Sequence, residues 1–142
     1  MTQIDFYTQA GDRLHTACRI ASKARGHGLR VTLFCPDRET AMRLDRMLWT
    51  VPATGFLPHC AADDRLAPVT PVLIDTTGDH HLHDEMLINL HAEWPAFFSR
   101  YQRLAEIVSS DDTDRAQARQ RYRFYRDRGY AIRTHDLSTT SA

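Results

Sequence analysis

Arginines dominate the segment between Asp114 and Asp127, near the end of the 142-residue chain. In a helix, with about 100° between successive residues, four side chains of this segment fall on one stripe roughly 60° wide. They are Arg115, Arg119, Tyr122 and Arg126, and Arg123 flanks them. Like charges on one stripe repel by roughly a few tenths of a kcal/mol per pair, so a bound anion would relieve an unfavourable arrangement.

The distribution of charge along the chain narrows the kind of anion that this stripe would bind. The formal net charge is zero, but residues from Arg115 onward carry +5 and residues 1–114 carry −5. A duplex-binding domain would have an isoelectric point well above the 7.1 of this chain. A short acidic peptide needs only a few arginines, and Tyr122 offers it an apolar wall. A solvated helix face and direct binding of single-stranded nucleic acid remain alternatives.

A second cluster of reactive side chains occupies residues 80–85. It contains five potential metal ligands: His80, His81, His83, Asp84 and Glu85. Adjacent histidines point in different directions, however, and the segment falls in a predicted loop with no helix to place the ligands on one face. The pattern favours a solvated turn, and a metal-dependent enzyme that uses this cluster is the alternative.

Sequence motifs for other catalytic or cofactor chemistry are absent. The turn at residues 8–12 has one glycine where a dinucleotide fingerprint needs three, and no GxxxxGK[ST] or GxSxG motif occurs. Asp75 ends a predicted strand, where α/β enzymes place catalytic acids, but a single aspartate there fits a helix cap or a loop cap better. Cys18, Cys35 and Cys60 are odd in number and widely spaced, which suggests neither disulfides nor a zinc site. We therefore expect no catalytic residues, no cofactor and no metal.

The elements that must position these side chains alternate between strands and helices. Apolar and β-branched runs predict strands at 4–7, 29–35, 71–75, 86–90 and 130–134, the last at an edge, and a short extended piece at 56–59. Periodic apolar residues predict helices at 12–26, from 37 to a point before 52, and at 111–129; the segment 95–109 combines an aromatic helical start with a β-prone end. This alternation predicts an α/β fold, with an open, mainly parallel sheet between helices in a single domain over 1–142, whose residues 135–142 form a flexible tail.

The composition excludes other classes of protein. Apolar residues make up 42% of the chain and charged residues 25%, which is typical of a globular domain. No apolar run approaches the roughly 20 residues of a membrane-spanning helix. The first residues lack the basic region and apolar stretch of a secretory signal, so we expect a cytoplasmic location.

Six short motifs follow one another along nearly the whole chain. They are Phe6-Tyr7; Ala41-x-Arg43-Leu44-Asp45-x-x-Leu48-Trp49; Pro52 with Phe56-x-Pro58-His59; Pro71-Val72; Leu87-Ile88-Asn89-Leu90; and Ala118-Arg119-x-Arg121-Tyr122-x-x-Tyr125-Arg126-x-x-Gly129-Tyr130. In this order they resemble the chi subunits of bacterial DNA polymerase III holoenzyme, which are accessory proteins of the clamp-loader assembly.

That resemblance implies a Rossmann-like, three-layer α/β/α fold without nucleotide binding, no catalytic activity and two protein-binding faces. One face would bind the acidic C-terminal tail of single-stranded DNA-binding protein, which ends in an apolar residue and a free carboxylate. The matching positions are Arg115, Arg119, Tyr122, Arg123, Arg126 and Thr134. The other face would bind the psi subunit of DNA polymerase III or a helicase-like repair partner, and DNA would be reached only indirectly. Its matching positions are Trp49, Phe56, Leu57 and Pro58.

The sequence departs from the family pattern in two respects. Arginines stand where lysines contribute to the basic pocket of the family's best-known member, which keeps the charge but changes the geometry of hydrogen bonding. Residues 135–142 do not follow the expected pattern.

For Trp49, core packing behind the second helix is the alternative to an interface.

Overall fold

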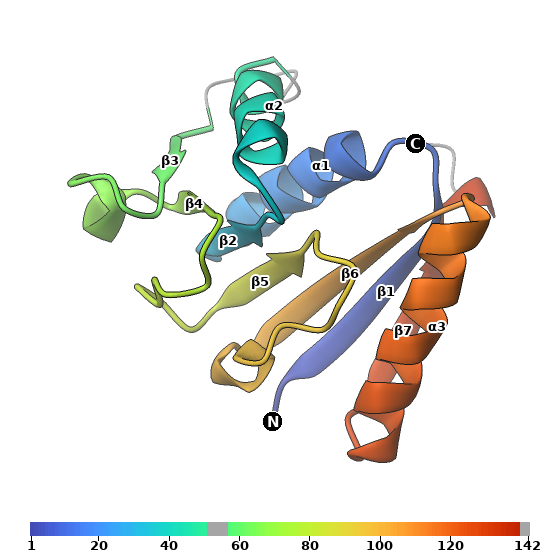
Figure 1. Cartoon of the computed structure of the whole chain (residues 1–142). Helices are drawn as coiled ribbons and strands as arrows, with labels where there is room; N and C mark the ends of the chain where they lie inside the picture. Colours follow the sequence, from blue (N-terminus) through green and yellow to red (C-terminus); the bar gives the residue numbers. More distant parts are fainter. Residues whose placement is uncertain (51–56, 140–142) are drawn as a thin grey trace.

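The computed structural model describes residues 1–50 and 57–139, and within these ranges seven strands form one parallel sheet (Figure 1). Across the sheet the order is β3-β4-β2-β5-β6-β1-β7. The strands are β1 (Gln3–Ala10), β2 (Val31–Phe34), β3 (His59–Ala61), β4 (Val72–Asp75), β5 (Met86–Asn89), β6 (Arg103–Ser109) and β7 (Ile132–Asp136). Since all pairings are parallel, the carboxyl ends of neighbouring strands meet at one edge of the sheet, where α/β proteins bind their ligands.

Helices cover both faces of this sheet. Two of them, α1 (Arg13–Gly26) and α2 (Arg38–Leu48), pack on one face, and α3 (Asp112–Asp127) packs on the other (Figure 1). Each helix begins after an aspartate whose carboxylate accepts a hydrogen bond from a backbone N–H of the first turn, which stabilises the helix start. These caps are Asp12, Asp37 and Asp111. The predicted three-layer α/β/α architecture is confirmed.

The core has one apolar cluster on each face of the sheet. Small side chains of α1, such as Ala17 and Ala21, let that helix lie close to the sheet. The α3 face is built from larger rings, including Phe6, Phe98 and Tyr125. Side chains alternate along β1, so that Phe6 faces α3 whereas Asp5 and Tyr7 face α1.

The structure corrects two boundaries that the sequence predicts. The aromatic residues at 97–101 form only the short 3-10 helix η2 (Phe98–Arg100), and β6 then takes up the whole of Arg103–Ser109 because it pairs with both β5 and β1. At the other end of the chain, β7 continues through Asp136 in register with β1, and η3 (Leu137–Thr139) follows it. His135 and Asp136 therefore belong to the sheet rather than to a flexible tail.

Candidate protein-binding groove

An open cavity of about 440 Å³ lies where the carboxyl ends of β1, β6 and β7 meet the first turns of α3. It is lined by Phe6, Thr8, Gln9, Val108, Ser109, Arg115, Ala118, Arg119, Tyr122 and Thr134. We refer to this cavity as the α3 groove. The parallel sheet places it because β1 and β7 pair from Ile4 to Thr8, which brings Thr134 beside Phe6.

The α3 groove combines two arginines with an apolar floor. Arg115 lies 3.9 Å from Asp112 in an exposed ion pair, and Arg119 makes no ion pair with any residue that the structure describes. Tyr122, which is 36% exposed, meets the ring of Phe6 edge-on at 5.4 Å between centroids. Val108 and Ala118 complete the apolar side. The groove can therefore accept an apolar side chain next to an anionic group.

The structure brings together four of the six residues predicted for the acidic-tail site. Arg115, Arg119, Tyr122 and Thr134 line the α3 groove. Arg123 and Arg126 are exposed on α3 but outside the lining, and Arg126 bonds the carboxylate of Asp127 at 3.1 Å.

Other lining residues are missing from the sequence prediction. Apart from Ala118 of α3, they come from the strands: Phe6, Thr8 and Gln9 from β1, and Val108 and Ser109 from β6. The alternation of side chains along β1 places Phe6 and Thr8 on one face, but their proximity to α3 depends on a strand order that the helical wheel does not contain.

A buried ionic network fixes α3 against the sheet. Arg121, which is 1% exposed, donates from Nε to Glu106 Oε1 of β6 at 2.9 Å and from Nη1 to the carbonyl oxygen of Ala92 at 2.7 Å. The hydroxyl of Tyr125 and the amide of Asn89 also donate to Glu106. These bonds hold the helix in one rotational position, which keeps the Arg115–Arg119–Tyr122 side toward the groove.

Burial has the largest effect on the pKa values of Glu106 and Tyr125 in this network. Desolvation raises the pKa of Glu106 above its usual value, although Arg121 and the hydrogen bonds from Tyr125 and Asn89 oppose the change. Desolvation also raises the pKa of the Tyr125 phenol, and the neighbouring Glu106 carboxylate adds to that effect. Tyr125 therefore stays a hydrogen-bond donor, and removing the Arg121 charge would leave a carboxyl group without its counter-ion.

The second predicted face, around the end of α2, is only partly exposed. Trp49 is 59% exposed and meets His59 edge-on at 5.0 Å, so its ring is a surface group rather than a core group. Pro58 is exposed as well. Leu57 is 6% exposed and packs in the α1-side core, beneath this surface. Phe56 lies outside the described residues.

The histidines of residues 80–83 point to separate neighbours in the structure. Within the described ranges, no group of three or more His, Cys, Asp or Glu side chains is arranged to hold a metal ion. Each histidine has a different neighbour: His80 Nδ1 lies 3.3 Å from Asp75, His81 Nδ1 lies 3.2 Å from the Tyr101 hydroxyl, and His83 Nε2 lies 2.9 Å from the Thr32 hydroxyl. Burial lowers the pKa of His83, and the Arg30 charge lowers it further. The segment is therefore partly packed against the fold, not a freely solvated turn.

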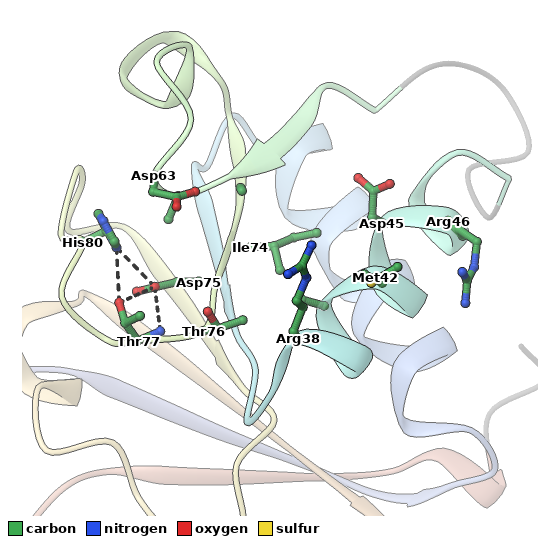
Figure 2. Close-up of a pocket in the computed structure, with 13 residues that line it drawn as sticks. Arg38, Met42, Asp45, Arg46, Asp63, Ile74, Asp75, Thr76, Thr77 and His80 are labelled. Atoms are coloured by element: carbon green, nitrogen blue, oxygen red, sulfur yellow. Dashed lines mark hydrogen bonds and ion pairs between the residues drawn. The ribbon is translucent and has the colours of Figure 1, made fainter.

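Asp75 and His80 lie beside a second cavity, of about 630 Å³, between α2 and the carboxyl end of β4 (Figure 2). Asp75 accepts hydrogen bonds from the backbone N–H and the hydroxyl of Thr77, as Figure 2 shows, so it caps its own loop as the sequence predicts. Side chains of both signs line this cavity, including Arg38 and Asp45. The mixture gives it no clear preference for one ligand charge.

No helix in the described part of the chain has the length and apolar character needed to cross a membrane.

Comparisons with known proteins agree along most of the chain. The family model for "DNA polymerase III chi subunit, HolC" matches residues 1–133. The DNA polymerase III subunit chi of Pseudomonas aeruginosa is 39% identical over 142 residues, which cover 96% of this chain and 98% of that protein. The subunit chi of Haemophilus influenzae is 30% identical over 122 residues, covering 85% of each chain. The subunit chi of Escherichia coli is 31% identical over 118 residues, covering 82% of this chain and 80% of its own.

Proposed function

Because the chain belongs to the family of DNA polymerase III chi subunits, we propose that it acts as a non-catalytic adaptor of that polymerase in the cytoplasm. Its α3 groove binds the acidic C-terminal tail of single-stranded DNA-binding protein. A second face holds the adaptor to the clamp-loader assembly through the psi subunit, or to a helicase-like repair partner. DNA is reached through the binding protein and not by direct contact.

The observation that carries this proposal is the pairing of unneutralised arginine with an apolar pocket. Arg119 has no acidic partner among the described residues, and the rings of Phe6 and Tyr122 lie beside it in the α3 groove. A peptide that ends in an apolar residue offers both complements at once, because its last side chain and its terminal carboxylate are adjacent. Guanidinium binds carboxylate with two parallel hydrogen bonds, which gives the site directional selectivity.

The proposal of a second binding face rests on the exposed indole of Trp49. An exposed tryptophan is typical of a protein interface, where a large rigid ring contributes contact area at little entropic cost. Pro58 lies on the same connection after α2 and is also exposed. A partner helix or loop with an apolar face fits this surface.

The first test measures the binding of a synthetic acidic peptide that ends in Phe, by titration calorimetry. We expect Arg119→Ala to weaken binding by about 1 to 3 kcal/mol, as for loss of a charge-assisted contact. Amidation of the terminal carboxylate should weaken binding to the unaltered protein, and added salt should weaken it as well. Arg46→Ala, an exposed arginine of α2, is the matched control. An unchanged affinity of Arg119→Ala would count against the site.

A further inference from the structure

A second groove lies on the opposite face of the sheet, between α1 and the strands β1, β6 and β7. It consists of two adjoining cavities of about 600 and 300 Å³, which share Tyr7, Ile20, Lys23 and His135 in their lining. We refer to it as the α1 groove. Tyr7 and His135 stack on each other at 4.7 Å between ring centroids and form part of its wall.

Cationic side chains from three elements meet in the α1 groove. Arg19 and Lys23 come from α1, Arg103 from β6 and Arg133 from β7. Arg19 and Lys23 are exposed and form no ion pair with any described residue. Lys23 is also the one lysine of the sequence.

The acidic side chains of the α1 groove, Asp5 and Asp12, neutralise only part of this charge. Asp5 is 2% exposed and is shared by three groups: His135 Nε2 at 2.9 Å, Arg133 Nε at 3.4 Å and Arg103 Nη2 at 3.6 Å. The carboxylate of Asp12 caps α1. The groove therefore keeps an excess of positive charge even with its histidines neutral.

Gln9 connects the two grooves. It lines both the α3 groove and the α1 groove, at the carboxyl end of β1 where the pairing with β6 shifts register. Its φ of 59° lies in the left-handed region, which a residue other than glycine adopts rarely and at a cost of roughly 1 kcal/mol or more. This bend leaves Gln9 exposed at the edge of the sheet, between the two grooves.

The opposite direction out of the α3 groove is acidic. Asp111, Asp112 and Asp114 form the start of α3, next to Arg115. Arg13 of α1 bonds the carbonyl oxygen of Ile107 at 3.2 Å and lies 3.6 Å from Asp114, so this part of the edge is closed. An acidic chain leaving the α3 groove meets repulsion there and meets cations across Gln9.

We infer that the acidic part of a peptide anchored in the α3 groove continues over Gln9 into the α1 groove, where Arg19, Lys23 and Arg133 bind its carboxylates. This inference rests on the proposed function and extends the same site to the second face of the sheet. The occupant is an acidic peptide in an extended conformation, because continuity with the α3 groove and charge complementarity both favour it. A single-stranded nucleic acid in the α1 groove is the competing outcome.

Two peptides of different length separate this inference from the proposed function. The short one has four residues and ends in Phe; the long one has ten and carries acidic residues before the same ending. We expect the long peptide to bind more tightly, and Arg19→Glu/Lys23→Glu to weaken it about fivefold or more while changing the short one less than twofold. Arg43→Glu/Arg46→Glu, which reverses two exposed charges on α2, is the matched control.

Each outcome bears on one of the two proposals. Loss of short-peptide binding in Arg119→Ala, together with equal effects of the two double variants on the long peptide, would support the α3 groove and overturn the extension. A long peptide whose acidic residues are replaced by Ser should bind like the short one. If Arg19→Glu/Lys23→Glu abolishes binding of an oligothymidylate but leaves the long acidic peptide unaffected, the α1 groove is a nucleic-acid site and the inference is wrong.

Discussion

Arg119 and Arg121 stand two residues apart in α3 and have opposite surroundings. Arg121 points into the sheet, is 1% exposed and is bonded to Glu106. Arg119 points into the α3 groove and has no acidic neighbour among the described residues. The guanidinium of Arg121 is therefore paired with a carboxylate inside the fold, whereas that of Arg119 has no carboxylate partner in the described ranges.

The difference shows how one helix serves both folding and binding. A buried charge is tolerated only when an opposite charge lies beside it, so Arg121 and Glu106 depend on each other. An exposed arginine costs the fold little and keeps its hydrogen-bonding capacity for a ligand. Two kinds of variant should therefore separate stability from binding along the same helix.

The largest effect is expected from Arg121→Ala. It leaves Glu106 buried without its counter-ion, and loss of one partner of a buried pair costs about 3 to 5 kcal/mol of unfolding free energy. The cost should grow as the pH rises above the ordinary carboxyl pKa, because burial already raises the pKa of Glu106 and the folded variant must protonate it or bear the charge. Urea unfolding at pH 5 and at pH 7.5 measures both quantities.

A double variant distinguishes a stranded charge from lost packing. Arg121→Met/Glu106→Gln removes both charges and keeps most of the side-chain volume, so it should be more stable than Arg121→Ala and less dependent on pH. Equal stability of the two variants would show that packing and the bond to Ala92, not the ion pair, hold α3 in place.

A smaller effect, on binding instead of stability, is expected from Tyr122→Ala. Its ring forms the apolar wall of the α3 groove and is partly exposed, so truncation removes contact area for the peptide's terminal side chain. We expect a loss of about 1 to 2 kcal/mol in peptide binding. Tyr122→Phe should bind nearly as the unaltered protein does, since the wall is retained. Unfolding midpoints of all three proteins would show whether the groove itself persists.

The sequence predicts the fold and the family well because both depend on local patterns. Alternating strands and helices indicated the parallel sheet, and the match of the chi family model confirms the resemblance drawn from short motifs. The helical wheel places Arg115, Arg119, Tyr122 and Arg126 on one stripe of α3, and all of these except Arg126 line the groove.

Strand order and burial could not be obtained from those patterns. Phe6 reaches the α3 groove only because β1 lies between β6 and β7, far from its neighbours in sequence. In the sequence, nothing distinguishes Arg121 from the exposed arginines of α3, since its partner Glu106 is fifteen residues away in a strand. Leu57 is one of the residues that the resemblance assigns to a binding face, yet it packs in the core. Each of these depends on tertiary contacts between distant segments.

The smallest effect is expected from Arg123→Ala, and it sharpens the distinction between arginines that line the groove and arginines that merely share the helix. Arg123 is exposed and outside the lining, so its loss should weaken peptide binding by about 0.5 kcal/mol or less, and added salt should remove the difference. Titration calorimetry beside Arg119→Ala compares the two directly. Equal losses would mean that the peptide runs along the outer side of α3 instead of crossing Gln9, which would contradict the path into the α1 groove.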